Sequence, residues 1–138
     1  MRALFALFIL VASSTTGWAS QWVAFGEGGE GQFAIAIDLD SIQRQGSRVT
    51  VWERFSYNQP VKHTGGRFIH VIKSHQSYDC DRQSTLLLHG FAYGDVNATV
   101  ALDTIRYSDR PSNYSAVATR SVEERILDQV CSNALAIR

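Results

Sequence analysis

The sequence predicts an α+β domain in which a single antiparallel β-sheet of about six strands carries a C-terminal α-helix and one disulfide. Along several segments, large apolar residues alternate with small or polar residues, which is the period of a strand with one packed face. Near the C-terminus, apolar residues recur at helical spacing instead. The chain also holds two cysteines, and two cysteines in an exported chain are most simply a pair.

Export is predicted from residues 1–19, which read as a signal peptide. Arg2 precedes an uninterrupted apolar run over residues 3–12, and small and polar residues then lead to a cleavage site after Ala19. The run is too short for a permanent membrane-spanning helix, and an uncleaved N-terminal anchor is the alternative. No cysteine lies in the cleavage region, so we expect no lipid or membrane anchor after cleavage.

Residues 20–138 are expected to form one domain, because their length suffices for one hydrophobic core and no repeat divides them. Without Arg2, the chain carries twelve basic and thirteen acidic side chains. A protein that binds nucleic acid needs a basic surface, so this balance opposes a nucleic-acid partner.

The first two strands are predicted at residues 22–25 and 32–38, joined by a Gly-rich hairpin loop at residues 26–31. This loop lacks the Lys-Ser/Thr pair and the following helix of a phosphate-binding loop, and it contains two acids. A turn is expected next, at residues 38–42, because Asp and Ser side chains can bond to nearby backbone.

Residues 48–57 have the β-branched and aromatic composition of a strand. Glu53 shares one face of this strand with apolar and aromatic residues, whereas Trp52 lies on the other face. A break is predicted at residues 58–60, which include a proline. Further strands are predicted at residues 67–78, 85–93 and 98–105, followed by a loop or edge segment at residues 106–120.

A C-terminal helix is predicted to start at Ser121, which forms a capping box with Glu124. Its apolar face would include Cys131, and a bond from there to Cys80 would staple the helix to one end of the sheet. Such a bond stabilises a fold by roughly 2–4 kcal/mol; free or intermolecular thiols are the alternative. The apolar face comprises Val122, Ile126, Leu127, Val130 and Cys131.

The sequence predicts no catalytic, metal or cofactor site. Asp38/Asp40 and Asp79/Asp81 are more typical of turns than of a cation site or glycosidase pair. No Gly-x-Ser-x-Gly nucleophile elbow is present. The histidines have no compact zinc spacing and are expected at the surface or at edges. They are His63, His70, His75 and His89.

Aromatic residues are numerous for a small sheet. Together with arginines they could form a contact surface, because Tyr, Trp and Arg dominate binding hot spots. We expect Trp22 and Trp52 to pack in the core instead, and the tyrosines remain open between the two interpretations. The tyrosines in this group are Tyr57, Tyr78, Tyr93, Tyr107 and Tyr114, and the arginines are Arg48, Arg54, Arg67 and Arg106.

The order of these features resembles the surface-adhesin protein E family of Gram-negative bacteria. The most specific similarity is the Asp-x-x-Ser-Ile stretch at residues 38–42 and the positions of Cys80 and Cys131. Looser strand patterns extend the resemblance over nearly the whole mature chain. The resemblance implies an antiparallel sheet with a C-terminal helix, tied by a disulfide.

The resemblance also implies a protein partner, since the name-giving adhesins bind host matrix and serum proteins and can pair into dimers. We therefore expect an exported, non-enzymatic binding module that contacts a host protein or an envelope component, or forms a homodimer. The alternatives are a periplasmic structural or stress protein and a small periplasmic hydrolase. Because the mature chain lacks a lipid-anchor cysteine, a periplasmic or secreted location is expected. The candidate contact residues are Lys62, Arg67, Tyr78 and Tyr93.

Overall fold

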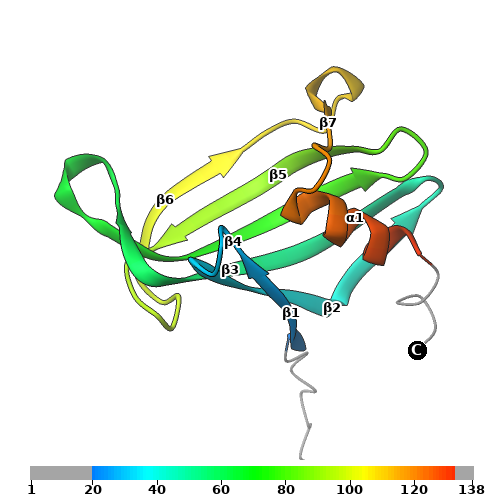
Figure 1. Cartoon of the computed structure of the whole chain (residues 1–138). Coiled ribbons are helices and arrows are strands. Elements are labelled where there is room, and N and C mark those ends of the chain that lie inside the picture. Colours follow the sequence, from blue (N-terminus) through cyan, green and yellow to red (C-terminus); the bar gives the residue numbers. More distant parts are fainter. Residues whose placement is uncertain (1–19, 133–138) are drawn as a thin grey trace, which may run out of the picture.

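The computed structural model describes residues 20–132, so the predicted signal peptide and residues 133–138 lie outside the described part (Figure 1). Between these limits, a seven-stranded antiparallel sheet carries one C-terminal α-helix, which confirms the predicted fold class. Two short 3-10 turns lie at Thr64–Gly66 and Pro111–Asn113. The other elements are β1 (Trp22–Gly28), β2 (Phe33–Gln45), β3 (Arg48–Lys62), β4 (Phe68–Asp79), β5 (Ser84–Tyr93), β6 (Ala101–Arg106), β7 (Ser115–Ala116) and α1 (Val122–Cys131).

The sheet is a meander in which β1 to β6 lie side by side in chain order, and the two-residue β7 adds to one end of β5. Each neighbouring pair is antiparallel. Helix α1 lies across one face only, toward the end of the sheet that holds the β4–β5 turn (Figure 1). Among the elements formed by residues 20–132, no α-helix covers the opposite face or the remaining part of the face that carries α1.

Strand β2 continues through the turn predicted at residues 38–42. Asp38 pairs with Trp52 and Gln43 pairs with Thr50, so five steps along β2 oppose two along β3. The extra residues form a bulge, in which the Ser41 hydroxyl donates to the Asp38 carbonyl at 2.6 Å and accepts from the Trp52 amide at 2.8 Å. The predicted local bonding is present, but it bends a strand instead of ending it.

The break predicted at residues 58–60 is also a bulge. Strand β3 extends to Lys62, and its pairing with β4 shifts between Ser56 and Val61. A proline lacks the amide proton of a regular ladder, and a bulge leaves such a position unpaired, which explains how Pro60 lies within a strand.

The hydrophobic core lies between α1 and the face of the sheet that it covers. Ser121 caps the helix by accepting from the Glu124 amide at 3.0 Å, as predicted. At the other end, the Arg44 guanidinium donates to the Val130 carbonyl at 3.0 Å, which satisfies a carbonyl of the last turn. The buried residues of this core are Ile35, Ile37, Val49, Val51, Tyr78, Ile126, Leu127 and Val130.

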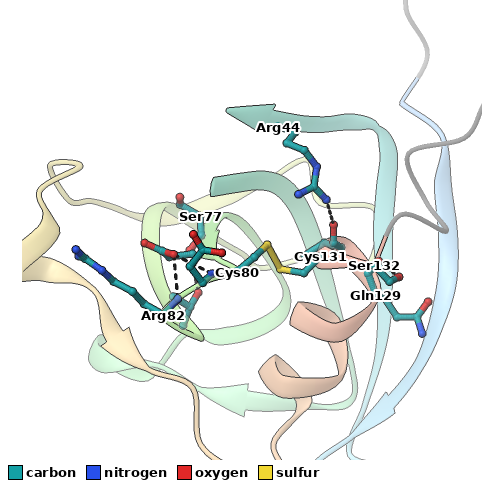
Figure 2. The surroundings of a disulfide bond; sticks show 11 residues. Arg44, Ser77, Cys80, Arg82, Gln129, Cys131 and Ser132 are labelled. Carbon is teal, nitrogen blue, oxygen red and sulfur yellow. Dashed lines mark hydrogen bonds between the residues drawn. A yellow bond between two sulfur atoms is a disulfide. The ribbon is translucent and has the colours of Figure 1, made fainter. Parts of the chain in front are cut away.

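The predicted disulfide is present and joins the β4–β5 turn to the last turn of α1 (Figure 2). The Cα atoms of Cys80 and Cys131 are 5.7 Å apart. The Cys80 amide donates to the Ser47 carbonyl at 2.8 Å, which ties the turn to the β2–β3 hairpin. The bond therefore links the helix to a backbone position that the sheet itself holds in place.

A carboxyl group lies within the core beneath the helix. Glu53 is 1% exposed, and its Oε1 accepts from the Tyr78 hydroxyl at 2.5 Å. Burial raises the pKa of Glu53 to about 8, although the hydrogen bond from Tyr78 lowers it and the nearby charge of Glu123 raises it further. Burial and the neighbouring Glu53 likewise raise the pKa of Tyr78. At neutral pH the Glu53 side chain is therefore mostly uncharged.

Removal of the disulfide should weaken the fold without changing it. The double variant Cys80→Ser/Cys131→Ser should lose about 2–4 kcal/mol in free energy of unfolding, because the unfolded chain gains freedom. Urea denaturation monitored by circular dichroism measures this loss. Peptide mapping of the non-reduced protein should yield a Cys80–Cys131 linked peptide; two alkylatable thiols would contradict the assignment.

Glu53 should make stability depend on pH. A carboxyl whose pKa is higher in the folded state stabilises that state fully below about 4.5, and the contribution is lost as pH rises through about 8. Each pKa unit corresponds to about 1.4 kcal/mol. In urea denaturation from pH 4 to pH 9, Glu53→Gln should flatten this decline, whereas the control Glu30→Gln, in an exposed turn, should retain it. An equal decline in both variants would show that Glu53 is not its source.

A candidate binding surface on the face opposite the helix

The face of the sheet opposite α1 carries a row of ring side chains. Residues paired across antiparallel strands point to the same face. Trp22 pairs with Asp38, which pairs with Trp52, and the row continues through His75 to His89. A second row on this face runs through Lys73 and Phe91, which also pair. We call this surface the aromatic face; its rings belong to Trp22, Trp52, His75, His89, Phe91 and Tyr93.

The rings at the centre of the aromatic face pack against one another. The rings of Trp52 and His75 are nearly parallel, with centroids 4.8 Å apart. Phe91 lies 5.9 Å from Trp52, and His89 lies 6.1 Å from His75, between ring centroids. All four side chains are only partly buried. The stacking holds large apolar surfaces in fixed orientations while leaving part of each ring in contact with solvent.

Cationic groups lie among these rings. The Lys73 ammonium is 5.4 Å from the ring centre of Tyr93 and 5.8 Å from that of Trp22, so it bridges the two by cation–π contacts. The Arg54 guanidinium donates to the Val96 carbonyl at 2.7 Å. This bond brings the β5–β6 loop to the same face, and Val96 itself is 62% exposed. The surface therefore combines rings, an exposed aliphatic side chain and two positive charges.

One irregularity brings His75 and His89 together. His75 pairs with His89, but the next residue, Gln76, pairs with Leu87, so Leu88 is an extra residue in β5. Sequence reasoning placed the histidines at the surface or at edges and did not find this pair. Alternation along a strand predicts which face each residue occupies, but a bulge reverses the assignment beyond it. Gly90, inside the same strand, is the signal that could have indicated this bulge.

The predictions for Trp22 and Trp52 were wrong. Both were expected in the core, but both lie on the aromatic face, because β1 presents Phe25 and β3 presents Val51 to the core beneath α1. An arginine packs on an aromatic ring elsewhere in the fold. The Arg48 guanidinium lies 5.0 Å from the ring centre of Tyr114.

Three of the four predicted contact residues lie at one end of the sheet. Lys62 and Arg67 flank the β3–β4 connection, and both are exposed. The Arg67 guanidinium donates to the Leu102 carbonyl at 3.3 Å, beside Ala101, which pairs with Tyr93. Tyr78 is at the other end and is 0% exposed. The prediction for Tyr78 was wrong, because its ring fills the core and its hydroxyl binds Glu53.

The paired acids act in local structure. Asp38 accepts from the Asp40 amide at 3.2 Å. Asp79 accepts from the amides of Asp81 and Arg82 at 3.2 and 3.1 Å, the second of which is drawn in Figure 2. Asp79 therefore has the turn-stabilising role expected of it, whereas Asp38 bonds to backbone within the β2 bulge. Within residues 20–132, no three His, Cys, Asp or Glu side chains gather as they would around a metal ion.

His75 should titrate below the usual range of histidine. Burial lowers the pKa of His75 from 6.5, because it disfavours the charged imidazole. The charge of His89 lowers this pKa further, because like charges repel. An NMR titration of the imidazole resonances should show this, and His89→Asn should raise the His75 pKa partway toward 6.5. The variant His70→Asn, on the same strand, is the matched control. A His75 pKa at or above 6.5 would contradict the described packing.

Comparison with known proteins extends these findings. No curated protein matches the sequence. Protein E from non-typeable Haemophilus influenzae has a similar structure, with a TM-score of 0.57 at 10% identity, covering 87% of this chain and 83% of that one. A second crystal form of Haemophilus influenzae protein E gives the same TM-score and identity, covering 86% and 92%. At this identity the likeness shows the fold alone.

The family is shown by sequence. A model of the family described as surface-adhesin protein E matches residues 22–132, which span every strand and the helix of the described structure. Within the described residues, no helix is long and apolar enough to span a membrane. The chain belongs to the surface-adhesin protein E family.

Proposed function

We propose that this protein is an exported, non-enzymatic binding module that contacts a protein partner through the aromatic face. The observation that carries the proposal is the row of stacked, partly exposed rings around Trp52 and His75 on the side of the sheet that α1 leaves free. Membership of a surface-adhesin family supports a protein partner. The family also suggests a protein without catalytic activity.

The chemistry of the aromatic face suits a protein surface. Trp, Tyr and Arg are the residue types that contribute most to binding hot spots. Rings that already stack lose little conformational freedom when a partner covers them, so more of the contact energy remains as affinity. Lys73 and Arg54 would favour acidic side chains at the edge of the partner's apolar patch. Lys62 and Arg67, beyond Tyr93, extend the positive charge of the surface.

The partner depends on where the protein resides. We propose a periplasmic or secreted location, reached through the signal peptide predicted at residues 1–19. A secreted or surface-exposed pool would meet host matrix or serum proteins, whereas a periplasmic pool would meet only envelope components. Fractionation of cells carrying an epitope-tagged chain distinguishes the two locations. Light scattering of the purified domain tests whether a second copy of the chain is also a partner.

Substitutions on the aromatic face test the proposal. Immobilised matrix and serum proteins, and an envelope extract, are exposed to the purified domain and to the variants Trp52→Ala and Lys73→Glu. Each variant should bind at least about tenfold more weakly than the parent chain, because one removes the central ring and the other reverses a charge. Melting curves establish that each variant folds.

The matched control is Gln129→Ala, an exposed position on α1, on the opposite side of the sheet. Its binding should equal that of the parent chain. Equal binding by the parent and both face variants would exclude the aromatic face as the contact surface. Absence of binding to every matrix, serum and envelope component would contradict the proposal as a whole.

A further inference from the structure

An apolar groove lies on the same side of the sheet as α1, beyond the first turn of the helix. Its volume is about 440 Å³, within the range of roughly 300–1,000 Å³ that small-molecule sites occupy. Side chains from β2 to β6 form its floor and walls, so its shape depends on the sheet and not on a single loop. Its apolar lining includes Phe33, Phe55, Ile69, Ile72, Leu87 and Ile105.

Aromatic rings form one wall of the groove. Phe33 packs edge-on against Phe55 and against Tyr57, with ring centroids 5.6 Å apart in both pairs. Gly28 allows Phe33 to pack close to the backbone, because a Cβ at this position would overlap the Phe33 ring and lie 2.8 Å from Val122. The ring position is therefore fixed by backbone on one side and by neighbouring rings on the other.

One buried hydroxyl and two acidic side chains line the groove. The Ser74 hydroxyl lines it, is part of a residue only 4% exposed, and has no hydrogen-bond partner in the structure. A buried hydroxyl without a partner costs free energy, and a ligand that bonds to it would recover that cost. Among the described residues that line the groove, Glu123 and Asp103 are acidic, and no Lys or Arg is present.

The two acids differ in their surroundings. Asp103 is 3.3 Å from the His63 imidazole, a partner that can offset its charge. Glu123 lies in the first turn of α1, where its neighbour Glu124 is bonded to the Arg120 amide at 2.6 Å. The charge of Glu123 raises the pKa of the buried Glu53, so these two carboxyl groups act on each other. A positive charge entering beside Glu123 would offset the negative charge of this carboxylate.

We propose that the groove binds a small organic cation, consisting of an ammonium group on an alkyl or aryl body. The ammonium would lie between Glu123 and the Ser74 hydroxyl, which accepts a hydrogen bond from it, and the nearby aromatic wall would favour the charge. The apolar body would cover Ile72, Leu87 and the 48% exposed Ile105. A ligand with the same apolar body but a carboxylate in place of the ammonium would be repelled by the acidic side chains of the groove. This site is separate from the aromatic face and does not depend on its function.

Three probes of one alkyl chain length separate charge from apolar contact: octylammonium, octanoate and octan-1-ol. Methyl NMR of the full mature domain reports where each one binds. Octylammonium should shift the methyl resonances of Ile69, Ile72 and Leu87. It should leave unchanged those of Leu127, which lies on the buried face of α1. It should also bind most tightly of the three. Octanoate binding as tightly as octylammonium, or shifts located elsewhere, would overturn the proposal.

Two variants and a control complete the test. Glu123→Gln should weaken octylammonium binding about tenfold and leave octan-1-ol unaffected, because only the charge contact is lost. Ile72→Trp should fill the groove and abolish both. Asp128→Asn, which removes the same charge from an exposed position of α1, should leave binding unchanged. Equal weakening by Asp128→Asn and Glu123→Gln would show only a general effect of net charge and would refute the site.

Discussion

The attachment of α1 to one face of the sheet is the constraint on which the other features depend. Four interactions secure it: the buried apolar face of the helix, the Arg44 bond to the last turn, the Arg125 bond to the Glu27 carbonyl of β1, and the disulfide at the β4–β5 turn. Because the disulfide is at one end of the sheet, the ten-residue helix covers that end and stops short of the other. The seven-stranded sheet is larger than one such helix can cover.

Two surfaces of different chemistry result from this incomplete cover. On the helix side, the uncovered part of the apolar face forms the groove beside Glu123. On the other side, the stacked rings of Trp52 and His75, with Phe91 packed beside them, take the place of a second layer. Side chains stacked in this way are stable without a covering element, and they still present apolar area to a partner. The fold thus explains why large aromatic residues occur on a face that no helix covers.

The sequence predicted which strands and helix form better than it predicted where each strand ends or bulges. The Ser121 cap, the apolar helix face and the cysteine pair are local patterns with direct physical meaning, and all were recognised. The bulges at residues 38–43 and 56–61 were not, because turn-forming residues stabilise a bulge as well as a turn. The bulge at Leu88 was not recognised either, because it interrupts a run of residues that reads as one continuous strand. The faces of Trp22 and Tyr78 were misjudged for a related reason: which face of a sheet is covered depends on where the distant helix attaches.

Tryptophan fluorescence tests the central claim most directly. The chain has three tryptophans, of which Trp18 lies within residues 1–19 and the other two lie on the aromatic face. In the mature domain, all tryptophan fluorescence should therefore come from Trp22 and Trp52, and quenching by acrylamide should report the exposure of this face alone. We expect substantial quenching in the free domain and strong protection once a binding partner is added. A bound partner that leaves the quenching unchanged would contradict the assignment of the aromatic face as the binding surface.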